Sequence, residues 1–168
     1  MELDYKKLRL NCGLECHQQL DTNKLFCSCP SLLRANEPDI SVKRKLHAVA
    51  GETGEIDVAA VFEHAREREF VYQAYSDTTC LVELDEEPPH LINEEALRIA
   101  LQISLLLNAE PIDISQIMRK TVIDGSNTSG FQRTLLIAQD GYIETSSGKI
   151  GIAGICLEED AARIISQN

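Results

Sequence analysis

The sequence predicts an α+β protein with a largely antiparallel sheet and flanking helices. Segments that read as strands, rich in β-branched and aromatic residues, outnumber those that read as helices. The connections are short, and two of them, Asp140–Gly141 and Ser146–Gly148, have the composition of hairpin turns. Because tight turns of this kind join antiparallel neighbours, they decide the class.

The clearest helix is expected from Glu94 to about Leu107, where apolar residues follow helical spacing. Asn93 can cap its first turn, and the acidic residues that follow complement the positive end of the helix dipole. A shorter helix is expected from Val58 to Arg68, with Asp57 as its N-cap. The apolar face of the first helix reads as core packing and not as a binding groove.

Strands are expected where apolar and polar residues alternate or β-branched residues gather: 10–20, 42–50, 70–75, 80–84, 114–123, 134–139, 142–144 and 149–158. An acidic loop at 85–90, broken by two prolines, follows one of them. We expect this loop to be solvated, and we give no ligand role to His90.

The composition is that of a soluble globular protein. A length of 168 residues can bury a core as one domain, and the 43% apolar and 26% charged residues are ordinary. No apolar run is long enough for a membrane span, and the N-terminus has no export signal. The net charge of −11 argues against this chain binding nucleic acid by itself, because the neutralisation of backbone phosphates requires stripes of basic residues. The six scattered cysteines are typical of reduced, cytoplasmic proteins.

The first candidate site is the segment Gly13–Leu20. Read as a strand, it places Glu15 and His17 side by side on one face, opposite a mostly apolar face. A carboxylate beside an imidazole can serve a hard divalent metal such as Mg²⁺. A second carboxylate can come from Glu158 or Glu159, which point to opposite faces, so that only one can join. An ordinary half-buried strand and a solvated acidic edge explain the same patterns.

The second candidate site is a loop bracketed by Gly125 and Gly130. Its backbone amides and hydroxyls can cradle phosphate oxygens, with Lys120 or Arg133 supplying charge. It lacks the order of a Walker loop, and a surface turn explains the same composition. The residues concerned are Ser126, Asn127, Thr128, Ser129 and Gly130.

A zinc site is the third possibility, suggested by Cys27 and Cys29. A closed structural zinc site needs four ligands, commonly two close pairs, and this is the one close pair in the sequence. We therefore expect two packed free cysteines and no zinc.

Several motifs occur together in one order: Gly13–Leu20 (Gly-Leu-Glu-Cys-His-Gln-Gln-Leu), Phe26–Cys29, Met118–Lys120, Asp140–Glu144 and Leu157–Ala162. In this order the chain resembles the B/E subunit family of tRNA-dependent amidotransferases. The segments 77–89 and 121–133 favour the archaeal E type, as does the lack of a second Cys-x-x-Cys around 44–50.

The resemblance implies a fold and a reaction. The fold is the family's cradle domain, similar to glutamine synthetase and guanido kinases. In the reaction, ATP phosphorylates the γ-carboxylate of glutamate misacylated on tRNA(Gln), and ammonia then displaces the phosphate to leave Gln-tRNA(Gln). The implied partner is an asparaginase-like glutaminase subunit of the D type, in a hetero-oligomer that supplies the ammonia.

The resemblance also implies roles for single residues. Glu15, His17 and Glu159 match metal positions for Mg²⁺ at the ATP site. Arg119 and Lys120 match a basic pair near the substrate, and we take them as the catalytic residues. The loop residues Ser126, Thr128, Ser129 and Gly130 are expected to contact the phosphates of ATP. Cys27 and Cys29 match half of a zinc knuckle seen in some members.

The chain stops at Asn168, just after its Glu-Glu-Asp motif. The resemblance therefore implies the N-terminal part of the cradle domain, over residues 1–168, with the tail domains that hold Glu-tRNA(Gln) lying outside it. Two other readings stay open. One is an inactive fragment that serves as a scaffold for the glutaminase partner, and the other is a bacterial-type B subunit that also acts on Asp-tRNA(Asn).

Overall fold

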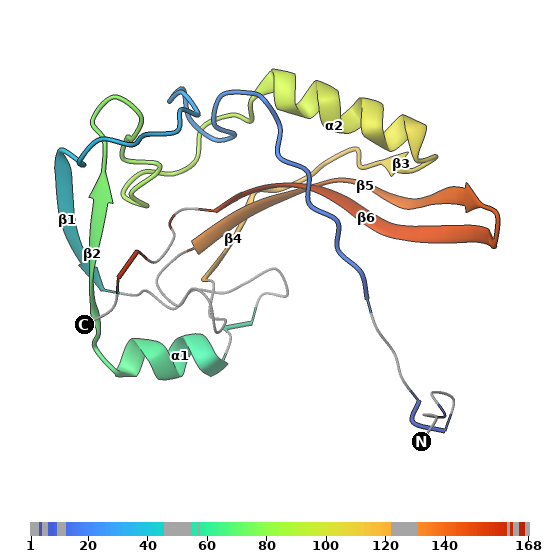
Figure 1. Cartoon of the computed structure of the whole chain (residues 1–168), viewed down its shortest axis with the longest axis horizontal. Helices are drawn as coiled ribbons and strands as arrows, with labels where there is room; N and C mark the ends of the chain where they lie inside the picture. Colours follow the sequence, from blue (N-terminus) through green and yellow to red (C-terminus); the bar gives the residue numbers. More distant parts are fainter. Residues whose placement is uncertain are drawn as a thin grey trace.

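The computed structural model describes residues 4, 7–9, 13–45, 55–56, 58–121, 131–160, 162 and 165–166, with the backbone alone at 120 and 121. Its elements follow one another along the chain as shown in Figure 1. They are β1 (Ile40–Lys45), α1 (Val58–Ala65), β2 (Glu69–Ala74), α2 (Glu94–Leu106), β3 (Glu110–Pro111), β4 (Met118–Thr121), β5 (Phe131–Thr145) and β6 (Gly148–Asp160).

The main sheet is organised around β5, and all of its described pairings are antiparallel. Strand β6 pairs along one side of β5, while the short strands β3 and β4 pair with different stretches of the other side. Strands β1 and β2 form a separate antiparallel ribbon. The predicted α+β class with antiparallel sheets is therefore confirmed.

Strands β5 and β6 form the long hairpin that projects to the right in Figure 1. Its turn is at residues 146–147, and Gly148 follows with a φ of 114°, a conformation that glycine adopts without steric cost. This confirms the predicted turn at Ser146–Gly148. The other predicted turn, at Asp140–Gly141, is wrong, because both residues lie within β5.

Gly141 is explained by close packing instead of by a turn. A Cβ at this position would lie 2.9 Å from Ala109 Cβ and 2.9 Å from the Leu107 carbonyl oxygen. The next amide, that of Tyr142, donates to the same Leu107 carbonyl at 2.7 Å. A strand glycine here lets the end of α2 approach the backbone of β5.

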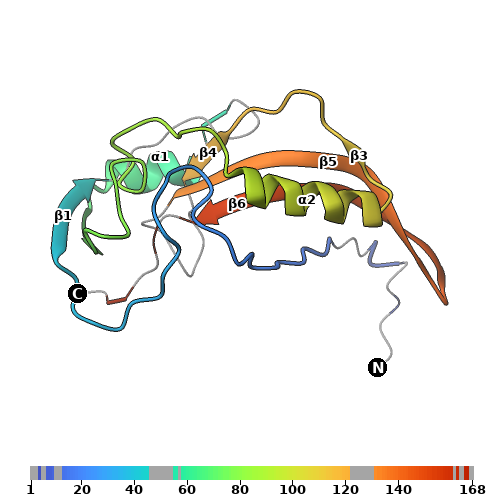
Figure 2. The same ribbon diagram turned by 90° about the horizontal axis from the view of Figure 1, so that it is seen from above.

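Helix α2 packs along the β5–β6 hairpin, as Figure 2 shows from above. As predicted, Asn93 caps it, its side chain accepting from the amides of Glu95 at 3.0 Å and Ala96 at 3.2 Å. Its small residues face the sheet, and Ala96, Ala100 and Ser104 are buried. The core cluster is completed by Leu25, Phe26, Cys27, Val82, Leu135, Ile137 and Leu157.

Three strand predictions differ from the structure. The described residues of the 10–20 segment, 13–20, are irregular and run past the hairpin in Figure 1. Residues 80–84 belong to a turn segment closed by backbone hydrogen bonds such as that from the Leu84 amide to the Cys80 carbonyl at 3.2 Å, and Val82 is completely buried within it. Of the predicted strand at 114–123, only β4 is paired within the described residues.

Other boundaries moved by a few residues. The predicted strand at 42–50 is observed as β1, and residues 46–50 lie outside the described part, as does the proposed cap Asp57. Helix α1 ends at Ala65, before the predicted Arg68. The segments 134–139 and 142–144 merge into β5, and 149–158 lies within β6.

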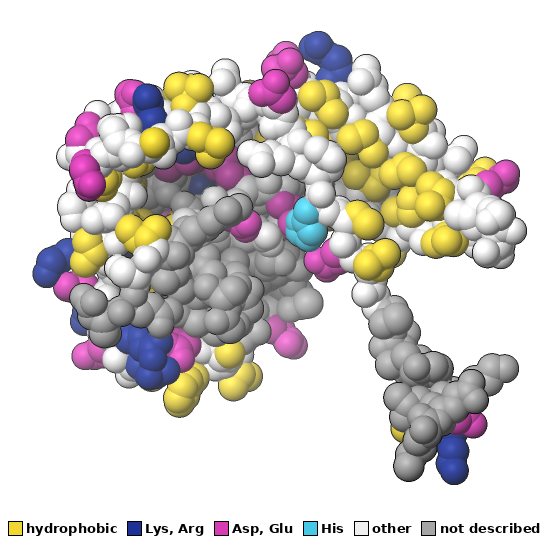
Figure 3. Space-filling model, viewed as in Figure 1, with side chains coloured by type: hydrophobic (Ala, Val, Ile, Leu, Met, Phe, Trp, Pro, Cys, Tyr) yellow, Lys and Arg dark blue, Asp and Glu magenta, His cyan; other side chains and the backbone are white. Residues whose placement is uncertain are grey.

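Hydrophobic side chains gather over α2 and the β5–β6 hairpin on the face shown in Figure 3. Leu105 and Leu106 at the end of α2 are 70% and 80% exposed, and Ile150 on β6 is 52% exposed. Three partly or fully buried charged side chains, those of Asp85, Arg119 and Arg133, lie together near the end of β5 that is away from the hairpin turn, where β4 and β6 flank it.

Candidate functional site

The candidate site is built on one row of residues that crosses three strands. Arg119 of β4 lies opposite Arg133 of β5, and Arg133 lies opposite Glu159 of β6. Directly opposed residues in an antiparallel sheet project to the same face, with strands about 4.8 Å apart. The register therefore brings the predicted catalytic Arg119 and the predicted metal ligand Glu159 to one face, with Arg133 between them.

Asp85 joins this row from a turn segment, residues 80–86. Its Oδ1 accepts from Arg119 Nε at 3.0 Å, and its Oδ2 accepts from Arg119 Nη2 at 2.6 Å. Arg133 Nη2 donates to the same Oδ1 at 3.3 Å, and Arg44 Nη2 lies 3.5 Å from Oδ2. We call these four residues the Asp85 cluster. The prediction of a solvated loop is wrong for Asp85, whose side chain is 17% exposed.

The arginines of the Asp85 cluster are partly or fully buried. The side chain of Arg133 is 3% exposed and that of Arg44 is 9% exposed. The Cζ atoms of Arg119 and Arg133 lie 4.8 and 4.6 Å from the ring centroid of Phe131, which is itself buried. Burial lowers the pKa of Arg133 below its ordinary value, while the nearby carboxylate of Asp85 opposes this change.

Glu159 sits in a second group of charges beside the cluster. Its Oε2 accepts from the amide of Leu25 at 2.7 Å, and its carboxyl group shares a hydrogen bond with Glu83. Burial and the negative charge of Glu83 raise the pKa of Glu159 to about 7. Lys24 pairs with Glu83 and also donates from Nζ to the Thr78 carbonyl at 2.7 Å. Two carboxyl groups in contact hold either a proton or a cation.

Glu15 and His17 lie side by side, although their segment is not a strand. His17 Nε2 is 3.6 Å from Glu15 Oε2, and the two side chains are 71% and 90% exposed. Among the described residues, the one group of three or more candidate ligand atoms within 4.8 Å of one another consists of cysteines. Glu15, His17 and Glu159 thus do not form a closed set here, and their metal role stays a prediction.

The group of close ligand atoms is formed by Cys27, Cys29 and Cys80. Sequence reasoning left Cys80 in a strand of its own, but the 80–86 turn brings its sulfur beside the other two. Burial raises the pKa of the Cys27 thiol, and burial together with a hydrogen bond to Cys80 raises that of Cys29. The Cys27 and Cys29 thiols are therefore protonated at neutral pH, and a bound metal would displace their protons.

The cysteine group changes the argument about zinc. We expected none because the sequence offers one close pair, and the structure supplies a third sulfur. Glu83 is also close, since Cys27 Sγ donates to its Oε1 at 3.5 Å. The group can hold a metal ion, although a closed zinc site takes four ligands.

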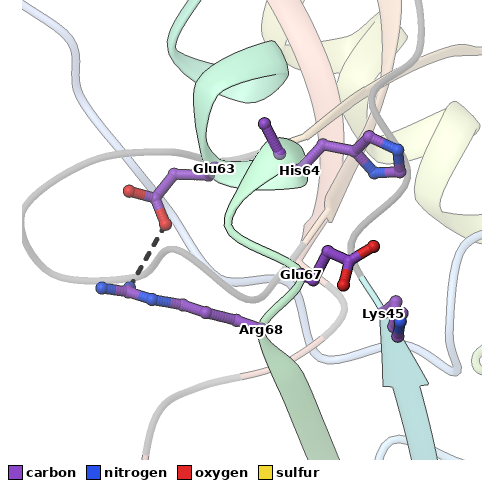
Figure 4. A pocket seen from close by; sticks show the side chains of 6 residues that line it. Lys45, Glu63, His64, Glu67 and Arg68 are labelled. Atoms are coloured by element: carbon purple, nitrogen blue, oxygen red, sulfur yellow. Dashed lines mark ion pairs between the residues drawn. The ribbon is translucent and has the colours of Figure 1, made fainter.

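Other predicted site residues lie outside the described part. These are the loop residues Ser126, Thr128, Ser129 and Gly130, and the side chain of Lys120, whose backbone belongs to β4. A surface pocket of about 160 Å³ lies between α1 and the β1–β2 ribbon and contains none of the predicted site residues. Figure 4 shows its charged lining and the ion pair of 3.2 Å between Glu63 and Arg68.

A family model described as the GatB/GatE catalytic domain matches residues 10–168. The chain belongs to the GatB/GatE catalytic domain family. It is 60% identical over 166 residues to the E-type subunit of glutamyl-tRNA(Gln) amidotransferase from Methanocaldococcus jannaschii. It is 54% identical over 166 residues to the proteins of the same name from Pyrobaculum aerophilum and Methanosarcina acetivorans.

These comparisons confirm the resemblance that the motifs indicate, and the relatives carry the E-type name. Each comparison covers 98% of this chain but only 26–27% of the relative, so the GatB/GatE chain spans about a quarter of their length. In the described residues, no helix has the length and apolar character needed to cross a membrane.

Proposed function

We propose that the chain is the N-terminal part of the catalytic domain of a glutamyl-tRNA(Gln) amidotransferase subunit of the E type. The observation that carries this proposal is the 60% identity over nearly the whole chain to a subunit of that name. The reaction would be ATP-dependent phosphorylation of the γ-carboxylate of Glu-tRNA(Gln), followed by amidation with ammonia. A glutaminase subunit of the D type would supply the ammonia in a cytoplasmic hetero-oligomer.

The row across the sheet suits this chemistry. Phosphoryl transfer depends mainly on positioning and on neutralising negative charge. Arg119 would bind the oxyanion that is transferred or attacked. Lys120, the second residue of the predicted catalytic pair, follows Arg119 in β4 and stays proposed as a basic residue near the substrate, although successive strand residues project to opposite faces. The phosphate would turn the γ-carboxylate oxygen into a leaving group, which ammonia needs because a bare carboxylate is a poor acyl donor. The loop residues Ser126, Thr128, Ser129 and Gly130 would hold the phosphates of ATP.

The carboxyl groups fit a divalent cation in their donor chemistry. Glu83 and Glu159 contact each other, which favours either a shared proton or a cation between them. Glu15 and His17 present an oxygen and a nitrogen 3.6 Å apart at the surface. We assign Glu15, His17 and Glu159 to Mg²⁺, which would neutralise phosphate charge when bound. We also propose that the chain folds as part of a cradle domain similar to that of glutamine synthetase.

The test uses the full-length subunit in its complex. Glu15→Gln and His17→Ala should each abolish conversion of Glu-tRNA(Gln) to Gln-tRNA(Gln) while leaving the fold intact by circular dichroism. The chain offers a matched control in Glu87 and His90, whose side chains form another exposed carboxylate–imidazole pair at 3.1 Å. Glu87→Gln and His90→Ala should retain activity. Full activity in both Glu15→Gln and His17→Ala would remove the metal assignment.

A scaffold for the glutaminase partner is the alternative, and ATP binding separates the two. The 168-residue chain should bind an ATP analogue in a Mg²⁺-dependent way in calorimetry if the site is largely assembled within it. The scaffold alternative holds if the full-length subunit binds the nucleotide but the 168-residue chain does not.

A further inference from the structure

The Asp85 cluster holds Arg119 by a two-pronged contact. Both oxygens of Asp85 are used, one on Nε at 3.0 Å and the other on Nη2 at 2.6 Å. Such a fork fixes both the place and the plane of the guanidinium. It also leaves Nη1 as the nitrogen of Arg119 that Asp85 does not use.

Arg119 Nη1 is buried and finds no hydrogen-bond partner in the described part of the chain. A buried, charged donor without a partner costs free energy, so native proteins rarely keep one without a reason. The side chain as a whole is 23% exposed, so Arg119 lies at the edge of the buried region and not deep within it. An anionic oxygen that arrives at Nη1 would complete the hydrogen bonds of Arg119.

The turn that carries Asp85 is anchored in the core. Val82 is completely buried, and its carbonyl accepts from the Asp85 amide at 3.1 Å. Asp85 itself has a φ of 61°, in the left-handed region that aspartate and asparagine tolerate better than most residues. Arg44 donates to the Leu84 carbonyl and ties β1 to the same turn. The carboxylate is thereby held in one place before any ligand is present.

The balance of charge within the Asp85 cluster also favours the binding of an anion at Arg119. Three guanidinium groups contact the Asp85 carboxylate, in a chain whose overall net charge is −11, and one of them, that of Arg44, also lies 3.7 Å from Glu86. The other carboxylates near Arg133 are Glu83 and Glu159, which already contact each other. Around Arg119 itself, the carboxylate in contact among the described residues is that of Asp85. The environment of Arg119 therefore favours a second anion.

We propose that Asp85 is a positioning residue, which orients Arg119 so that Nη1 donates to a substrate oxyanion. The oxyanion is the γ-phosphoryl group of ATP or the γ-carboxylate of the glutamyl group, both of which present the same chemistry to a guanidinium. The proposal rests on the function proposed above and adds to it the residue that aims the catalytic arginine.

The experiment is a double-mutant cycle in the full-length subunit within its complex. Transamidation of Glu-tRNA(Gln) is measured for wild type, Asp85→Asn, Arg119→Gln and the double variant. Asn tolerates the left-handed backbone at this position but cannot accept both N–H groups of the fork. Asp77→Asn, which breaks an exposed Asp–Arg ion pair with Arg34, is the matched control.

We expect Asp85→Asn to lower kcat/KM about 100-fold, the loss that a misplacement of about 1 Å can cause. Because Asp85 acts through Arg119, the double variant should be no slower than Arg119→Gln, within about threefold. An increase in KM for ATP alone would identify the phosphoryl group as the oxyanion, and an increase for Glu-tRNA(Gln) alone would identify the γ-carboxylate. Asp77→Asn should match wild type.

Asp85→Glu keeps the charge of the cluster and covers the case in which Asp85→Asn does not fold. It moves the carboxylate by one methylene, so it should slow the reaction while leaving the melting temperature within a few degrees of wild type. The proposal would be overturned if the losses in kcat/KM of Asp85→Asn and Arg119→Gln multiply in the double variant. It would also be overturned if the Asp85→Glu variant is as active as wild type. A wild-type complex without any transamidation would overturn the proposed function itself, and with it this inference.

Discussion

The proton on Glu159 is expected to make the stability of the chain depend on pH in an unusual direction. Burial and Glu83 raise the pKa of this carboxyl group from its ordinary value of 4.5 to about 7. The folded chain therefore binds this proton more tightly than the unfolded chain does. Stability from this group is fully present below about pH 4.5, falls as the pH rises, and is lost above about pH 7.

The magnitude follows from the size of this change. A tenfold change in proton affinity corresponds to about 1.4 kcal/mol, so the rise from 4.5 to about 7 corresponds to about 3 kcal/mol. Glu159→Gln removes the titration but keeps an acceptor for the Leu25 amide and a donor for Glu83. The variant should equal wild type near pH 4.5 and be more stable by about 3 kcal/mol at pH 8.

The assay is urea unfolding of the 168-residue chain between pH 4.5 and 8, followed by circular dichroism because the sequence contains no tryptophan. EDTA keeps divalent cations away from the carboxyl groups. The difference between wild type and variant cancels the contributions of the histidines, which titrate in the same range. Glu158→Gln, on the opposite face of β6, serves as control. Stability curves of wild type and Glu159→Gln that run parallel across this range would refute the reasoning.

Three further outcomes are expected from the core and the strands. Phe26→Ala should lower the free energy of unfolding by about 3–5 kcal/mol, because Phe26 is completely buried; a loss under about 1 kcal/mol in urea unfolding would contradict its place in the core. Gly141→Ala should cost about 1–3 kcal/mol through overpacking against Ala109, and an unchanged melting temperature would speak against the close approach. At pH 8, iodoacetamide should modify the exposed Cys16 faster than Cys27, whose pKa is raised by burial; equal rates by mass spectrometry would contradict this.

The parts of the fold that could be predicted are those fixed by neighbours in sequence. Helix α2 follows from the Asn93 cap and the spacing of its apolar residues, and both act within a few positions. The turn at Ser146–Gly148 is likewise a local matter, because Gly148 supplies the positive φ. The strand predicted at 80–84 was wrong because apolar and β-branched residues are also used where a turn is buried. Composition alone does not distinguish a buried turn from a strand.

The site was predicted less completely, because its contacts join distant segments. Arg119 and Glu159 were proposed from motifs, and the register places them on one face, while their roles stay predictions. Asp85 was assigned to solvent, since nothing in its acidic, proline-containing loop indicates three arginines from β1, β4 and β5. Cys80 was missed for the same reason, since it reaches the other cysteines only through the fold of the 80–86 turn.

The hydrogen bond between the Leu25 amide and Glu159 joins residues 134 positions apart, and this affects how the chain folds as it is made. At about 5–20 residues per second, Leu25 waits roughly 7–27 s on the ribosome before its partner has been synthesised. Helix α2 can form during that time from local contacts, but Phe26 and Val82 have no sheet to pack on until β5 and β6 exist. The nascent chain thus exposes this part of its future core while most of these 168 residues are being made, which makes it a natural client for chaperones that bind apolar segments.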